Sequence, residues 1–152
     1  MTSTLSREDT EISIQIFADA VLVLVTQVGK VGNLIQASLP ATVPLQPAPP
    51  PDPLYPNALT LPPPPIAIQL TPLLGYAPSE HTQTLHNLYA SQIATIIWTA
   101  EAASPLQVSR KNVIVGIALR KTTTTEQSGL NEEERNTFSR VMSMIQEMLE
   151  TK

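Results

Sequence analysis

The first forty residues contain both alternating and unbroken apolar runs. Residues 11–17 alternate, so that Ile12, Ile14 and Ile16 share one face of a strand whose other face is polar. Residues 20–25 are apolar without interruption. Because successive strand residues point to opposite faces, this run is apolar on both faces. One face carries Val21, Val23 and Val25, and the other carries Leu22 and Leu24.

A glycine-bracketed turn follows this run. Gly29 and Gly32 provide the backbone freedom that a tight turn needs, and residues 33–38 form a further strand-like segment. The simplest interpretation of residues 11–38 is a meander of three antiparallel strands, with residues 20–39 as one hairpin.

Residues 40–65 hold twelve of the chain's 15 prolines. Proline lacks the backbone N–H and has a fixed φ, so this segment cannot lie in a helix or in the interior of a sheet. We expect a mobile segment in polyproline II conformation. Its LPPPP string at residues 61–65 could dock onto an SH3, WW or EVH1-type domain, although an inert spacer is the simpler interpretation.

The second half alternates between strands and helices. Residues 66–70 alternate as a strand, and Ser79 is a candidate N-cap for a helix that extends to about residue 102. Residues 112–119 form a strand that is again apolar on both faces. Asn131 and Glu134 resemble a capping pair before a last helix with one apolar stripe. That stripe consists of Phe138, Val141, Met142, Ile145, Met148 and Leu149.

These elements predict an α+β fold in which two α-helices cover one face of an antiparallel sheet of about five to six strands. We expect a flexible N-terminus over residues 1–9 and a single domain over residues 10–150, interrupted by the mobile loop at 40–65. Two helices can cover only one face, yet residues 20–25 and 112–119 are apolar on both. The second face is therefore expected to pack against a partner sheet. The alternative is that the Pro-rich loop folds across it.

Composition and charge exclude several functions. The net charge of −4 argues against nucleic acid as a partner, and the absence of cysteine excludes disulfides and thiolate metal sites. The N-terminus has no apolar h-region, and no apolar run approaches the ~20 residues that a membrane span needs. The sequence therefore predicts a soluble intracellular protein without a membrane span.

Candidate chemistry is sparse. His81 and His86 are the only histidines, and a spacing of five places them roughly 140° apart on a helix, which does not suit one metal. We expect a solvated His81, surface glutamates at 132–134 and a core position for Trp98. The GKVG sequence at 29–32 lacks the GxxxxGK[ST] pattern of a phosphate loop. Catalysis, metals and cofactors are not expected.

Residues 25–34, VTQVGKVGNL, closely resemble the TQxGKxGxL pattern of the proteasome assembly chaperone 3 family. TEISIQIFADA precedes this pattern, and an LLG segment before a helix, the strand VIVGIALRK and a C-terminal helix follow in the family's order. The resemblance covers residues 10–121 and extends to about residue 149. It identifies the chain as a fungal-type member whose Pro-rich loop is expanded.

The resemblance implies a dedicated chaperone without catalytic activity. Family members pair sheet to sheet with a proteasome assembly chaperone 4-type subunit. The pair promotes assembly of the 20S proteasome α-ring in the cytoplasm and nucleus by binding α subunits, α5 among them. Whether the free chain forms a homodimer or a heterodimer stays open.

The candidate partner-facing residues follow from the apolar strands and are Val21, Val23, Val25, Val113, Val115 and Ile117. Leu22, Leu24, Ile114 and Ala118 could exchange roles with that set, because the sequence does not fix which face the helices cover. Gln27 and Lys30, at the tip, are candidate contacts with the client subunit. Two further hypotheses are a polyproline-bearing adaptor that acts through residues 40–65 and a small enzyme or ligand-binding domain that uses the tip.

Overall fold

Six strands and two helices form the regular structure of the residues that the computed structural model describes, which are 2–7, 9–27, 32–46, 50, 53–54, 60–75, 79–102, 110–119 and 132–150. The strands are β1 (Thr2–Arg7), β2 (Thr10–Ile16), β3 (Ala20–Thr26), β4 (Asn33–Ser38), β5 (Gln69–Leu74) and β6 (Asn112–Ala118). The helices are α1 (Glu80–Ala102) and α2 (Glu132–Glu150). The predicted α+β class and the strand count are confirmed.

The strands form one mostly antiparallel sheet in the order β1-β2-β3-β6-β4-β5. The predicted hairpin over residues 20–39, and the meander with it, are wrong. Strand β6 lies between β3 and β4, parallel to the former and antiparallel to the latter. The reason is that β3 and β6 are apolar on both faces, which favours neighbouring positions inside the sheet. The more polar β1 and β5 take the edges.

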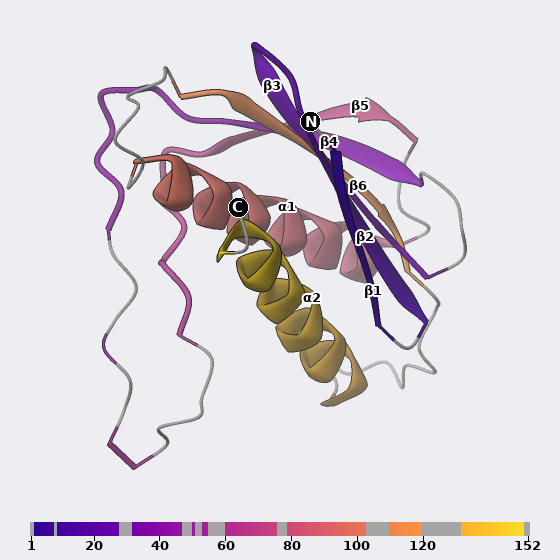
Figure 1. The fold of residues 1–152 in the computed structure, drawn as a ribbon. Helices are drawn as coiled ribbons and strands as arrows, with labels where there is room; N and C mark the ends of the chain where they lie inside the picture. Colours follow the sequence, from indigo (N-terminus) through magenta and orange to yellow (C-terminus); the bar gives the residue numbers. More distant parts are fainter. Residues whose placement is uncertain are drawn as a thin grey trace.

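Both helices lie on the same side of the sheet (Figure 1). Helix α1 packs on β4, β5 and β6, whereas α2 packs on β1 and β2. We call the covered side of the sheet the helix face and the opposite side the helix-free face. The core lies between the helix face and the two helices, where Trp98 and Tyr89 are the largest fully buried side chains. The predicted core position of Trp98 is confirmed, and its indole N–H donates to the carbonyl of Lys111 at 2.7 Å.

The start of α1 follows the capping prediction. The hydroxyl of Ser79 accepts a hydrogen bond from the backbone N–H of Thr82 at 3.2 Å, and the Ser79 carbonyl accepts from the N–H of Gln83. An N-cap of this kind contributes about 1 kcal/mol, because it satisfies one of the free N–H groups of the first turn. It fixes where α1 begins, and so where the side chains of its first two turns lie.

The N-terminal residues differ from the prediction of a flexible end. Residues 2–7 form β1, which pairs with β2 over six residues. Arg7 also forms an ion pair with Glu147 of α2. Both side chains are nearly half exposed, so this pair contributes little stability, and the ladder with β2 holds the strand in place.

Strand β5 starts later than predicted. Ile66, expected inside a strand, is fully exposed in a turn in which the Ile68 N–H donates to the Pro65 carbonyl. The strand continues through Pro72 instead of ending before Leu73. A proline is tolerated there because β5 is an edge strand, with one side free of hydrogen-bond partners.

The described parts of the Pro-rich segment contact the folded domain. We call residues 60–65 the strap. Within it, Leu61 packs against the core and Pro62 is buried, while Pro63 and Pro64 are exposed. The strap's described contacts go to the helices, so the structure gives no support to the alternative in which the loop covers the helix-free face.

Candidate interaction surface

The helix-free face carries an apolar band across its middle. Strand register places Leu24 of β3 beside Gly116 of β6, and Gly116 beside Leu34 of β4. Two residues earlier along β3 and β6, on the same face, Leu22 lies beside Ile114. These side chains are only partly buried, because neither helix covers them. The apolar band consists of Leu22, Leu24, Leu34, Ile114 and Ala118.

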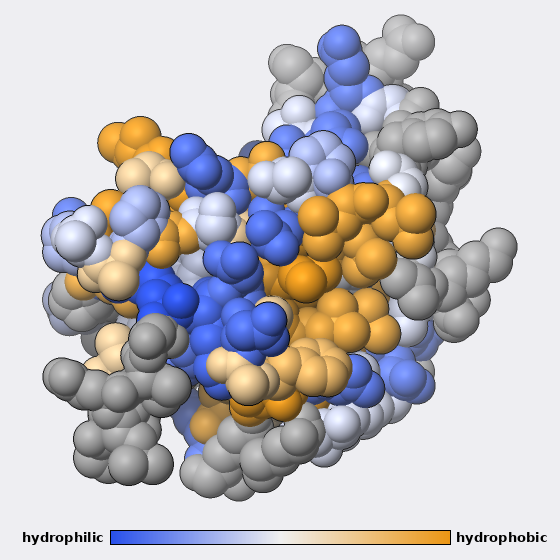
Figure 2. Space-filling model, turned by 90° about the horizontal axis from the view of Figure 1, so that it is seen from above, coloured by the Kyte–Doolittle hydropathy of each residue, from blue (hydrophilic) through white to orange (hydrophobic). Residues whose placement is uncertain are grey.

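The same face is polar over β1 and β2. Ser13 lies opposite Leu24, and Gln15 lies opposite Leu22. Figure 2 views the molecule from the side of the sheet away from the helices, and hydrophobic residues gather over one part of the surface with hydrophilic residues beside them. The band is therefore a local feature of β3, β6 and β4, and the polar strands border it on one side.

The predicted partner-facing set lies on the helix face instead. Val21, Val23, Val25, Val113, Val115 and Ile117 are each at most 1% exposed and belong to the core. They share their face with the isoleucines of β2, since Ile14 pairs with Val23 and Ile12 with Val25. Side chains enclosed by the chain's own helices cannot meet a partner, so this assignment is wrong. The set that could exchange with it, Leu22, Leu24, Ile114 and Ala118, lies on the helix-free face.

A tightly packed corner lies where β4 begins and where β5 and β6 end. Gly32 has φ of 69°, and a Cβ atom there would lie 2.1 Å from the backbone oxygen of Ile117. Gly75 has φ of 76° and approaches the Gly32 carbonyl. Only glycine fits a positive φ at such short distances. The corner therefore fixes the backbone just before β4 against the ends of β5 and β6.

A buried polar pair lies beside this corner, because Asn33 follows Gly32 directly in the chain. The side-chain amide of Asn33 lies 3.1 Å from Nδ1 of His86 on α1, and both residues are buried. Burial lowers the pKa of His86 below its usual value, which favours the neutral ring that can accept from the amide. The second amide atom, Oδ1 of Asn33, is buried without a hydrogen-bond partner. The pair joins the first residue of β4 to the second turn of α1.

Gln27, predicted to contact a client, makes internal contacts. Its backbone N–H donates to the Ala118 carbonyl at 2.9 Å, and its side-chain amide donates to the Thr10 hydroxyl at 3.2 Å. These bonds anchor the end of β3 to its neighbouring strands. Lys30, the second predicted client contact, lies outside the described residues, as does Asn131, the predicted cap of the last helix.

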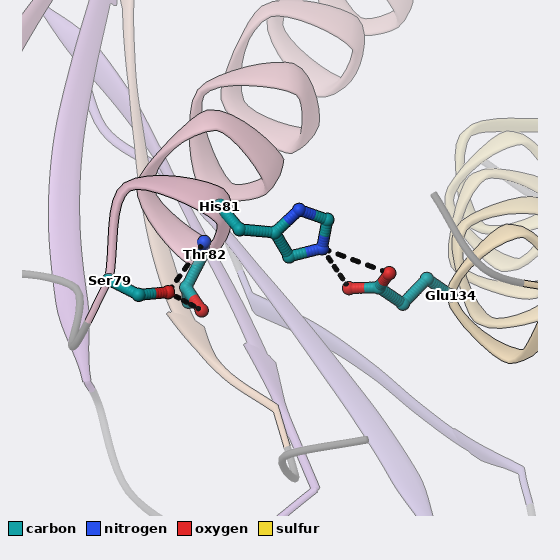
Figure 3. Close-up of polar contacts among 4 residues, drawn as sticks. All are labelled: Ser79, His81, Thr82 and Glu134. Atoms are coloured by element: carbon teal, nitrogen blue, oxygen red, sulfur yellow. Dashed lines mark hydrogen bonds and ion pairs between the residues drawn. The ribbon is translucent and has the colours of Figure 1, made fainter. Parts of the chain in front are cut away.

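A second polar contact joins the two helices. Nε2 of His81, in the first turn of α1, lies 2.9 and 3.0 Å from the carboxylate oxygens of Glu134 in α2 (Figure 3). Glu134 is 5% exposed, so the prediction of a surface Glu134 is wrong. The His81 side chain lies in the first turn as predicted and stays 35% exposed while it contacts this carboxylate. Burial and the Glu134 charge also raise the pKa of Tyr89, whose ring packs edge to face on Phe138. The contact fixes the N-terminal end of α2 against α1.

The described residues offer no evident chemical centre. They hold no group of three or more His, Cys, Asp or Glu that could bind a metal ion. Among them, neither helix is long and apolar enough to cross a membrane. No family model matches the chain, and a search of curated proteins finds no significant match. Among the described residues, the apolar band is the clearest candidate for a binding surface.

Proposed function

We propose that this protein is a non-catalytic assembly chaperone that pairs with a second small chaperone through the apolar band of its helix-free face. Together they bind proteasome α subunits, α5 among them, and promote formation of the 20S α-ring. The single observation that carries the proposal is the band itself, because an apolar sheet face of this kind is typical of a protein interface.

Two further points support this function. The resemblance of residues 25–34 to the proteasome assembly chaperone 3 family implies pairing sheet to sheet, and the helix-free face leaves one sheet surface available for it. The partner is expected over β3, β6 and β4, since the band lies there while β1 and β2 present polar residues such as Ser13 and Gln15. Gly32, within the family-like segment, lies at the glycine corner.

The test is a native pull-down with mass spectrometry on the full-length protein. We expect a second small chaperone and proteasome α subunits to co-purify. Recovery of neither would contradict the proposal. Recovery of proteins with SH3, WW or EVH1-type domains in their place would favour the adaptor hypothesis.

A pair of surface variants makes the test specific for the band. Leu24→Glu places a charge at the centre of the band, where a partner would have to desolvate it. Ser13→Glu is the matched control, because Ser13 is the cross-strand neighbour of Leu24 on the same face but lies in its polar part. We expect the first variant to lose the small chaperone and the second to retain it, with circular dichroism spectra unchanged. Equal retention by both would exclude the band as the interface.

A further inference from the structure

Side-chain amides of both helices hold the strap. Gln92 of α1 donates its Nε2–H to the carbonyl of Pro62 at 2.9 Å, and Nε2 of Gln146 of α2 lies 3.5 Å from the carbonyl of Thr60. Between these two carbonyls, Leu61 packs against the core. Two carbonyls of the strap thus accept hydrogen bonds from the helices, and the adjacent Leu61 and Pro62 supply its buried contacts.

The position of Gln92 is unusual for a glutamine. It is 6% exposed, within a stretch of α1 in which every residue from 92 to 98 is buried. A buried amide without a hydrogen bond costs about 1–3 kcal/mol, so a glutamine on this surface requires an acceptor. The Pro62 carbonyl is the acceptor that the structure provides. This surface of α1 therefore presents a buried N–H donor that a peptide carbonyl can satisfy.

Polyproline chemistry suits such a surface. A polyproline II segment makes no hydrogen bonds within itself, so its carbonyls remain free to accept from side-chain donors. Recognition of proline-rich peptides by folded domains combines such donors with apolar contacts to a preformed, extended backbone. The strap offers an apolar residue followed by four prolines, and its exposed Pro63 and Pro64 lie outside the contact.

We propose that the surface around Gln92 and Gln146 is a polyproline-binding site, occupied in this structure by the chain's own strap, and that the occupancy is reversible. Once the strap leaves, the site accepts a leucine-proline segment of the same sequence supplied in trans. The strap also masks its own LPPPP string while it is bound, because Leu61 and Pro62 are covered. This property is independent of the proposed pairing, which uses the opposite side of the sheet.

The test uses the full-length chain with the strap disabled by Leu61→Asp and Pro62→Gly, and a fluorescein-labelled peptide of residues 59–66, LTLPPPPI. We expect saturable anisotropy binding to the disabled chain. Binding to the wild type should be at least about tenfold weaker, because a tethered segment competes at millimolar effective concentration. Adding Gln92→Ala to the disabled chain should weaken binding about tenfold. Absence of binding to a folded disabled chain, or binding that Gln92→Ala leaves unchanged, would overturn the proposal.

A second measurement keeps the strap intact. The chain contains no cysteine, so Pro64→Cys introduces a single labelling site at an exposed strap position. Gln92→Ala should lower the anisotropy of a dye at this site, because the strap is released more often. Gln83→Ala is the matched control, since Gln83 lies on the same helix and donates to Asn87. An anisotropy equal in the Gln92→Ala, Gln83→Ala and unsubstituted chains would also overturn the proposal, even if the disabled chain did not fold.

Discussion

Truncation of two adjacent residues of β3 should separate the two faces of the sheet. Val23 is fully buried on the helix face, and Leu24, the next residue, lies partly buried in the apolar band. Val23→Ala removes two methyl groups at about 0.8 kcal/mol each, or about 1.6 kcal/mol. The cavity under the helices adds to this, so we expect a loss of about 2–3 kcal/mol of unfolding free energy.

Leu24→Ala should weaken binding to the partner more than it lowers the free energy of unfolding. In the isolated chain, water fills the space that the partly buried side chain leaves, and the loss should stay below about 1 kcal/mol. In the pair, the same side chain lies at the centre of the proposed interface, where truncation typically costs more than about 1 kcal/mol. Affinity for the partner should therefore fall by roughly tenfold.

Thermal melts followed by far-UV circular dichroism at low concentration give the first quantity, and sedimentation velocity with the partner gives the second. For a chain of this size, about 2–3 kcal/mol corresponds to a decrease in Tm of about 5–10 °C. We expect that decrease for Val23→Ala and little change for Leu24→Ala. If Leu24→Ala lowers Tm as much as Val23→Ala, our assignment of the two faces is wrong.

Three further predictions concern the corner and the helix contacts. Gly32→Ala should lower the free energy of unfolding in a urea melt by more than about 2 kcal/mol, because its Cβ would lie 2.1 Å from a backbone oxygen. Gly75→Ala should lower it less, because the nearest atom to its Cβ would be 3.2 Å away. The reverse order would contradict this account. Burial lowers the pKa of His86, so the unfolded chain binds more protons than the folded chain below about pH 6.5. The free energy of unfolding should therefore fall on acidification through that range, and less steeply in His86→Asn. Equal slopes of unfolding free energy against pH in the two chains would exclude the effect. A double-mutant cycle of His81→Ala and Glu134→Gln should give a coupling free energy of about 1–2 kcal/mol, and additive effects would mean that the contact does not stabilise the fold.

Local signals predicted the local elements well. Ser79 and the apolar spacing that follows it defined α1, and alternation over residues 11–17 defined β2. The insertion of β6 between β3 and β4 depends on contacts across about 90 residues, and no turn signal reports such contacts. The sequence pattern of β3 alone also treats its two faces equally, which is why it does not show that the valines face the helices.

Some of the missed information was nevertheless present in the sequence. The turn between β2 and β3 is short, so Ile16 pairs with Val21 and the isoleucine face of β2 continues into the valine face of β3. Since β2 has only one apolar face, the valines had to face the helices. Similarly, Glu134 lies four residues before Phe138 on the apolar stripe of α2, a position that indicates burial.

The capture of the proline-rich strap could not be predicted from composition. Proline content excludes helix and sheet interior, and it says nothing about whether an extended segment is bound to a surface. The decisive residues are Gln92 and Gln146, and a glutamine on a helix is usually read as a solvated residue. Only the three-dimensional arrangement shows that their amides reach backbone carbonyls 30 and 86 residues away in the chain.

The location of β6 determines when the sheet can close during synthesis. Strands β3 and β4 are complete by residue 38, but the strand that separates them ends at Ala118. On the ribosome, about 80 further residues must be synthesised before the facing backbone edges of these two apolar strands can pair with β6. Such long-range pairing is slow and leaves intermediates prone to aggregation. The nascent chain is therefore expected to need protection until β6 has emerged, so a protein proposed to assist assembly would itself depend on assistance while it folds.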